Sequence, residues 1–97
     1  MVDDLQAHVM ALIEPWNGRS LLKFRKKTLT PEMSLNLDMK LDPEDAAECL
    51  QKVFDAFGMD SDQVNFSLYY PKKPREAIPL TIGMLVESAR ARRWCYD

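Results

Sequence analysis

Apolar residues recur at helical spacing near the start of the chain. An apolar position every three or four residues is typical of an α-helix with one buried face, and this spacing joins Val2, Leu5, Val9, Leu12, Ile13 and Trp16. Asp3 and Asp4 place negative charge where the positive end of the helix dipole would be. Pro15 disfavours helical geometry in the residue before it. The pattern therefore predicts a first helix over residues 2–14.

The clearest helical pattern lies at residues 43–57. Asp42 is a favourable N-cap, and Pro43 takes the first helical position, where its missing N–H costs nothing. Gly58 is a typical C-terminal stop. One apolar stripe predicts the buried face of this helix and contains Ala46, Ala47, Leu50, Val53, Phe54 and Phe57.

The pattern is weaker between and after these helices. Leu29, Leu35 and Leu37 are expected to pin a long connection to the core. A short third helix is expected over residues 63–66, capped within residues 60–62. Thr81 caps a final helix, after which Trp94 is expected to fold back onto the domain. The inner face of that final helix is predicted to consist of Ile82, Leu85, Val86 and Ala89.

These elements predict an all-α fold, a small bundle of three longer helices and one short helix. A chain of 97 residues is expected to form one domain over residues 1–97. With 46% apolar and 29% charged residues, the composition is that of a globular protein rather than a disordered one. The formal net charge of −2 does not favour nucleic acid or a membrane surface as a partner.

The residues that usually carry metal or catalytic chemistry are sparse. Cys49 and Cys95 lie far apart and His8 is the single histidine, so the ligands of a structural zinc site cannot be assembled. Cys49 is expected to be a small core or boundary residue, and His8 a residue at the edge of the first helix's apolar stripe. Glu44, Asp45 and Glu48 are the densest carboxylates, and a solvated helix face accounts for them. We therefore expect no enzyme, no metal and no cofactor.

Nothing in the sequence indicates export or membrane insertion. No apolar run approaches the roughly 18 residues of a membrane span. Asp3 and Asp4 stand where a signal peptide requires a basic flank. We expect a cytoplasmic protein with both thiols free.

Residues 38–48 resemble the acyl carrier protein signature, Asp-Leu-Gly-x-Asp-Ser-Leu-Asp-x-x-Glu. Asp38, Asp42, Asp45 and Glu48 match its acidic positions. The closing stretch, residues 79–89 and Trp94, is similar to an uncharacterised family of small bacterial acyl-carrier-like proteins. The resemblance implies an acyl-carrier-like bundle, but Pro43 stands at the position of the serine that carries phosphopantetheine. Because proline has no hydroxyl, the resemblance implies a scaffold without that prosthetic group.

The function expected from this combination is a non-catalytic adaptor or regulator that binds another protein. By the resemblance, an acidic surface would contact that partner, formed by Glu44, Asp45, Glu48 and Asp55. A solvated helix face explains the same residues. An exposed patch of Tyr69, Tyr70 and Trp94 would support a homodimer, so the chain is expected to be a monomer or a homodimer.

Three alternatives remain open from the sequence. A genuine carrier would use a displaced serine, with Ser61 the first candidate and Ser67 the second. A small nucleic-acid-binding protein would use basic clusters, although aromatic residues do not interleave with them. An immunity-type protein would neutralise a partner, and such proteins share no sequence signature. The basic clusters are the stretch at residues 19–27, then Lys72, Lys73 and Arg75, and then Arg90, Arg92 and Arg93.

Overall fold

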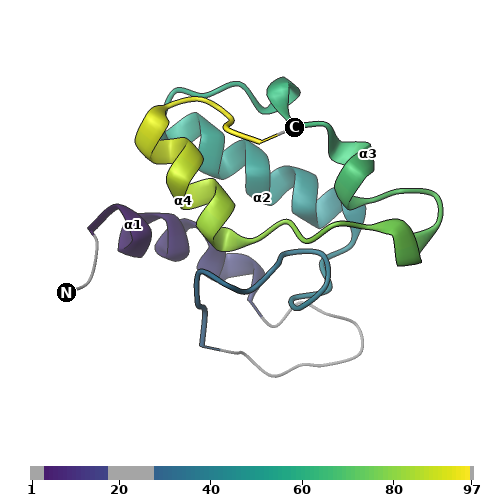
Figure 1. Ribbon diagram of the computed structural model, residues 1–97. Coiled ribbons are helices and arrows are strands. Elements are labelled where there is room, and N and C mark those ends of the chain that lie inside the picture. Colours follow the sequence, from purple (N-terminus) through teal and green to yellow (C-terminus); the bar gives the residue numbers. More distant parts are fainter. Residues whose placement is uncertain (1–3, 18–27, 97) are drawn as a thin grey trace.

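The computed structural model describes residues 4–17 and 28–96, and these residues form a helical globule (Figure 1). The predicted all-α fold, with three longer helices and one short one, is confirmed. The basic stretch at residues 19–27 lies outside the described residues. The elements in chain order are α1 (Asp4–Ile13), η1 (Glu14–Trp16), α2 (Pro43–Ala56), η2 (Ser61–Gln63), α3 (Phe66–Tyr69), η3 (Pro74–Glu76) and α4 (Ile82–Ala91).

Helix α2 begins and ends where its capping residues predict. The Asp42 carboxylate accepts a hydrogen bond of 2.8 Å from the Asp45 N–H, and Pro43 opens the helix. Gly58 adopts a φ of 68°, a left-handed conformation that glycine tolerates without steric cost. That turn lets the Met59 N–H donate to the Phe54 carbonyl at 2.8 Å and closes the helix in a Schellman motif.

One face of α2 forms the centre of the core. Ala46, Cys49, Leu50, Val53 and Phe54 are all at most 2% exposed. The predicted stripe is wrong at Ala47, which is exposed, and it omits the buried Cys49 from its members. Helices α1 and α4 pack together and α1 also contacts α2, so the core lies between these three helices (Figure 1).

The C-terminal residues after α4 complete the core. Trp94 folds back as predicted and is 7% exposed; its ring lies 5.9 Å from that of Phe54 and 6.3 Å from that of Tyr69. Tyr69 is 1% exposed. The expected exposed patch of Tyr69, Tyr70 and Trp94 is therefore wrong, because two of its three members are buried against each other.

The connection before α2 is held by backbone hydrogen bonds to the start of α4. The Leu35 N–H donates to the Leu80 carbonyl, and the Ile82 N–H donates to the Met33 carbonyl, both at 2.8 Å. Leu35 is fully buried and Leu29 partly buried, as predicted, whereas Leu37 is 45% exposed. The expectation for Leu37 is therefore wrong; this residue lies in the turn that follows Leu35.

The region after α2 differs from the single short helix that the sequence predicts. Asp60 caps only the turn η2, and Val64 then adopts extended backbone as it enters the core. Helix α3 begins two residues later. Thr81 caps α4 as predicted, accepting a hydrogen bond from the Met84 N–H at 3.2 Å. Within the described ranges, none of the helices has the length and apolar character needed to cross a bilayer.

Candidate functional site

The four acidic residues expected to contact a partner do not share one surface. Glu44, Glu48 and Asp55 are exposed and separated by four and seven residues, which places them on one side of α2. Asp45 is half-buried and turned about 100° away around the helix. We call the three aligned residues the acidic stripe. Asp45 instead faces the region of Cys49 and Tyr70, where its charge raises the pKa of both groups.

Ser61, the first candidate for a displaced attachment serine, is part of a surface hydrogen-bond chain. Its Oγ donates to Oε1 of Gln51 at 2.7 Å, and Nε2 of Gln51 donates to Oδ1 of Asp55 at 2.7 Å. Ser61 begins a three-residue turn rather than a long helix. Its hydroxyl therefore joins the end of α2 to η2.

An open apolar pocket lies beside the start of α2. Its cavity volume is about 320 Å³. We call it the proline pocket, since three of its lining residues are prolines. The lining consists of Asn36, Leu37, Pro43, Tyr69, Tyr70, Pro71, Pro74 and Ala77. Pro43, predicted as a blocked attachment position, here supplies part of an apolar wall.

Asn36 connects the segments that build the proline pocket. Its Nδ2 donates to the Tyr69 carbonyl at 2.9 Å and to the Ile78 carbonyl at 2.8 Å. Its Oδ1 accepts from the N–H groups of Leu80 and Leu37, both at 3.0 Å. One side chain thus bonds to the end of α3, to the residues before α4 and to its own connection.

Tyr70 forms a fixed aromatic wall of the pocket. Its hydroxyl donates to the Leu41 carbonyl at 2.8 Å, and its ring stacks on Phe66 with ring centroids 4.9 Å apart. Burial, followed by the charges of Asp42, Cys49 and Asp45, raises the pKa of Tyr70 well above its usual value. The phenol is therefore neutral at physiological pH, and its hydroxyl hydrogen is engaged in the hydrogen bond to the Leu41 carbonyl.

Exposed apolar side chains gather around the proline pocket. Leu37, Leu68 and Ile78 are 45%, 37% and 44% exposed, and they are the large exposed hydrophobic residues of the described chain. The Ile78 N–H donates to the Leu68 carbonyl at 3.1 Å, and Asn36, next to Leu37, bonds to Ile78. Neighbouring exposed apolar residues of this kind mark interaction sites more often than isolated ones do.

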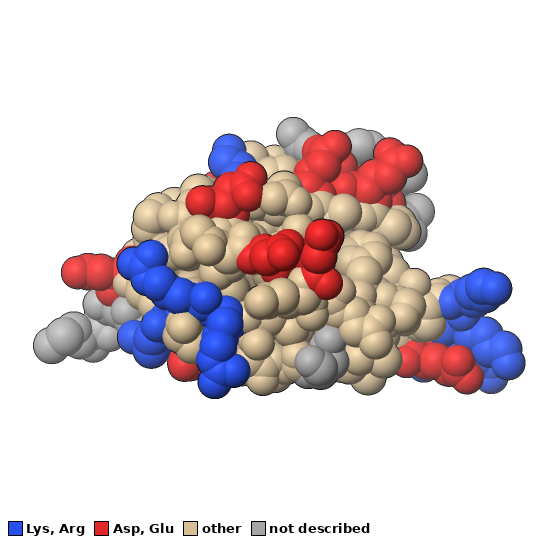
Figure 2. Space-filling model, turned by 90° about the horizontal axis from the view of Figure 1, so that it is seen from above, with Lys and Arg blue, Asp and Glu red and all other residues tan. Residues whose placement is uncertain are grey.

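Charge is separated along the face shown in Figure 2. Basic residues gather at one end over the loop that contains η3 and at the other over the C-terminal end of α4, with acidic residues between them. The loop cluster contains Lys72, Lys73 and Arg75, all exposed. At the opposite end Arg90 forms an ion pair with Glu87 at 3.6 Å.

The groups that sequence analysis considered for catalysis are dispersed. His8 is exposed at the edge of α1, as predicted, and its ring lies 5.1 Å from that of Phe57. Cys49 is fully buried, as predicted, and Cys95 is exposed. No three metal-binding side chains come together within the described part of the chain.

The proline pocket was not predicted from the sequence. The run Tyr69-Tyr70-Pro71 with Pro74 is unusually rich in aromatic and cyclic side chains, and this was the available local signal. The partners that complete the pocket, Asn36 and Leu37, lie more than 30 residues earlier, and only the folded chain brings them there.

Raising the pH above about 9 is expected to lower the free energy of unfolding through Cys49. Burial and the charge of Asp45 raise the pKa of this thiol from 9.0 to about 12. Between those values the folded chain keeps a proton that the unfolded chain releases, so stability falls as the pH rises. Urea unfolding at pH 8, 9, 10 and 11, roughly spanning this window, measures the slope.

The matched variants for this measurement are Cys49→Ala and Cys95→Ala. Cys49→Ala is expected to flatten part of the slope, and the remainder includes Tyr70, whose raised pKa acts in the same direction. Cys95→Ala removes an exposed thiol and serves as the control for the loss of a cysteine. An unaltered slope in Cys49→Ala would contradict the assignment.

Comparison with known proteins gives one match. The family model described as "Protein of unknown function (DUF1493)" matches residues 2–97. No curated protein and no solved structure matches the chain. The matched family is not an acyl carrier protein family, so the resemblance of residues 38–48 to the carrier signature led to a wrong assignment. The expectation of an uncharacterised family is confirmed.

Proposed function

We propose that this chain, which belongs to the DUF1493 family of proteins of unknown function, is a non-catalytic module that binds another protein. The observation that carries the proposal is the proline pocket together with Leu37, Leu68 and Ile78 around it. A monomer in water gains nothing from exposing three large apolar side chains on neighbouring segments. Burial against a partner would remove that apolar surface from water.

The polar groups of the proline pocket favour a protein partner over a small molecule. Small-molecule sites usually place a few free polar groups to orient the ligand. Here the donor and the acceptor of the Asn36 amide form hydrogen bonds within the chain, and so does the Tyr70 hydroxyl. What the pocket offers is shape and apolar area, which suits an anchoring side chain from another protein.

The same arrangement supports a role without catalysis. A catalytic group must reach a reacting atom with its proton or lone pair available. The Tyr70 phenol has a raised pKa and donates to a backbone carbonyl, and Cys49 is buried behind it with a pKa of about 12. Neither group is poised to exchange a proton at neutral pH.

The acidic stripe provides a second contact surface within this proposal. Glu44 follows Pro43 directly and Glu48 lies about one helical turn beyond Glu44, so a protein seated in the proline pocket would reach them. Exposed charges of this kind mainly steer association and select among partners. Glu44, Glu48 and Asp55 are therefore kept as partner-binding candidates, whereas Asp45 is not.

Site-specific photo-crosslinking in the source cells tests the proposal. A photoreactive amino acid at Leu37 and one at Ile78 are each expected to crosslink to a protein, and the two adducts are expected to have the same mass. The same amino acid at Ala7 is expected to give none, because Ala7 is exposed on α1 and this helix lies away from α3 (Figure 1). When Ile78→Asp is combined with the photoreactive amino acid at position 37, the yield of the adduct is expected to fall about fivefold or more. Equal adducts at all three positions would refute the site.

A further inference from the structure

We infer that the segment bound in the proline pocket is an acidic peptide with a large apolar anchor, held along the basic loop of residues 72–76. This inference rests on the proposed function and adds the chemistry of the partner. Three features carry it: unpaired positive charge on the loop, missing backbone donors at the three prolines of the pocket, and negative charge on both sides of Pro43.

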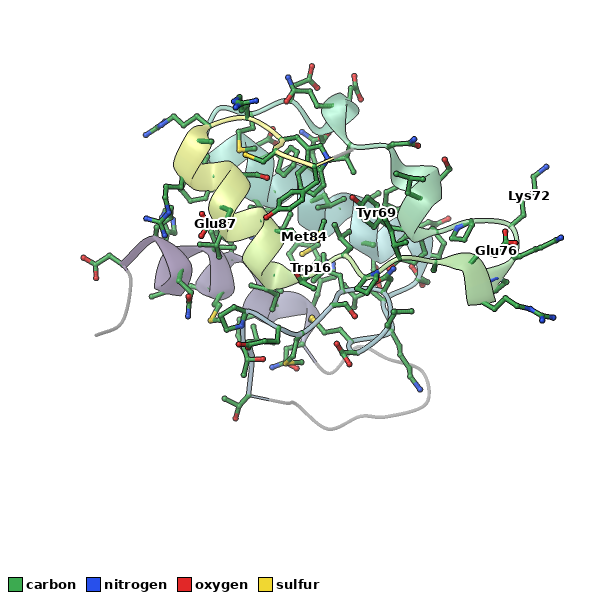
Figure 3. All side chains as sticks on the ribbon, viewed as in Figure 1. Trp16, Tyr69, Lys72, Glu76, Met84 and Glu87 are labelled. Atoms are coloured by element: carbon green, nitrogen blue, oxygen red, sulfur yellow. The ribbon has the colours of Figure 1, made fainter. Side chains whose placement is uncertain are left out.

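The basic loop has positive charge that no described carboxylate neutralises in an ion pair. Lys72, Lys73 and Arg75 are exposed, and among the described residues none of them takes part in an ion pair. Figure 3 shows Lys72 projecting from the body of the molecule, with Glu76 on the same loop. Three cations against one carboxylate leave this end of the pocket positive. An acidic partner segment would meet complementary charge here.

The prolines determine how such a segment can bind. Pro43, Pro71 and Pro74 have no N–H, so an added strand would find no backbone donor at these three positions of the walls. Affinity must then come from side chains inserted into the cavity of about 320 Å³. Large aromatic or branched side chains contribute the most apolar area in such a pocket.

Negative charge beside Pro43 limits where the acidic residues of the peptide can lie. Asp42 and Glu44 flank Pro43 and are exposed, and the Asp42 carboxylate is engaged with the Asp45 N–H. Acidic residues of the peptide are repelled there and attracted by the loop. The acidic flank is therefore expected to lie over residues 72–76, while the apolar anchor enters beside Pro43.

Nucleic acid fits this surface less well than an acidic peptide. Nucleic-acid affinity depends on many phosphate contacts along a continuous basic surface. The loop cluster is short, and the other basic cluster lies at the far end of the face, beyond acidic residues (Figure 2). A duplex laid across both clusters would pass over those carboxylates.

The test uses three synthetic peptides and the full chain. The first peptide has Glu and Asp flanking a Leu-Trp anchor; the second replaces its acids by Lys; the third replaces its anchor by Ser. Fluorescence anisotropy gives the affinities, and ¹⁵N chemical-shift perturbation locates the contact. The first peptide is expected to bind about tenfold or more tightly than the other two. Its shifts are expected at Leu37, Tyr70 and Ala77, and its affinity is expected to fall with added salt.

A matched pair of charge reversals separates the loop from general charge effects. Lys72→Glu/Lys73→Glu is expected to weaken the first peptide about tenfold or more. Arg92→Glu/Arg93→Glu changes the net charge equally at the opposite end and is expected to change the affinity less than about twofold. Equal losses in both variants would overturn the inference.

The remaining outcomes are also decisive. Tighter binding of the lysine peptide, shifts confined to another surface, or no binding of the acidic peptide at millimolar concentration would overturn it. A homodimer in sedimentation that Lys72→Glu/Lys73→Glu dissociates would make a second copy the occupant instead. If crosslinks at Leu37 and Ile78 capture a partner while the acidic peptide fails to bind, the proposed function stands and this inference falls.

Discussion

Replacing Phe54 by alanine is expected to lower the free energy of unfolding by about 3–5 kcal/mol. Phe54 is fully buried on the inner face of α2, and its ring lies 5.9 Å from that of Trp94. The substitution loses the apolar burial of the ring and leaves a cavity between α2 and the C-terminal residues. Urea unfolding followed by tryptophan fluorescence measures the loss, because Trp94 reports on the same contact.

Two further variants keep this measurement interpretable. A domain of this size has roughly 5–15 kcal/mol of stability, so Phe54→Ala can leave too little folded protein. Phe54→Leu keeps most of the volume and is expected to cost about 1–2 kcal/mol. Glu48→Ala, on the exposed side of the same helix, is expected to change stability by less than about 0.5 kcal/mol. Similar losses in Phe54→Leu and Glu48→Ala would contradict the assignment of Phe54 to the core.

The parts of the fold that were predicted correctly depend on neighbouring residues. The start of α2 follows from Asp42 and Pro43, and its end follows from Gly58. Thr81 determines the start of α4 in the same way. Each of these signals acts within about one helical turn, so the sequence around it contains the whole physical cause.

The parts that were predicted wrongly depend on distant residues. Leu37 and Tyr69 are both large and lie in weakly patterned segments, yet Leu37 is exposed and Tyr69 is buried. Their positions are set by the bonds of Asn36 to residues 33 and 42 positions later. Hydrophobicity alone cannot distinguish the two, and the proline pocket that they help to build was therefore not predictable.

The wrong family assignment has a related physical cause. Asp42 and Asp45 matched the carrier signature. However, Asp42 is the N-cap of α2, and its carboxylate accepts a hydrogen bond from the backbone N–H of Asp45. Negative charge in the first turn stabilises any helix. A capped helix start can therefore reproduce these two acidic positions of the signature without common ancestry. At Lys40, where the signature has glycine, the backbone φ is 54°, so even that conformation does not require glycine here.

Asn36→Ala is expected to lower the free energy of unfolding by about 2–4 kcal/mol, a large effect for a partly exposed polar residue. The alanine removes donors from the Tyr69 and Ile78 carbonyls and an acceptor from the Leu80 N–H. The Tyr69 side chain is 1% exposed and Leu80 is fully buried, so water replaces these bonds poorly. Urea unfolding measures the loss, with Leu37→Ala as the exposed neighbouring control.

Asn36→Asp distinguishes the hydrogen bonds from the shape of the side chain. Aspartate keeps the volume and the acceptor for Leu80, but an ionised carboxylate cannot donate to the two carbonyls and places negative charge beside them. It is expected to be at least as destabilising as alanine at pH 7 and to recover part of the loss below about pH 4, where it becomes a donor. Because Asn36 also lines the proline pocket, both variants are expected to weaken the Leu37 crosslink. A loss below about 1 kcal/mol in both variants would show that other contacts hold α3 and the start of α4 together.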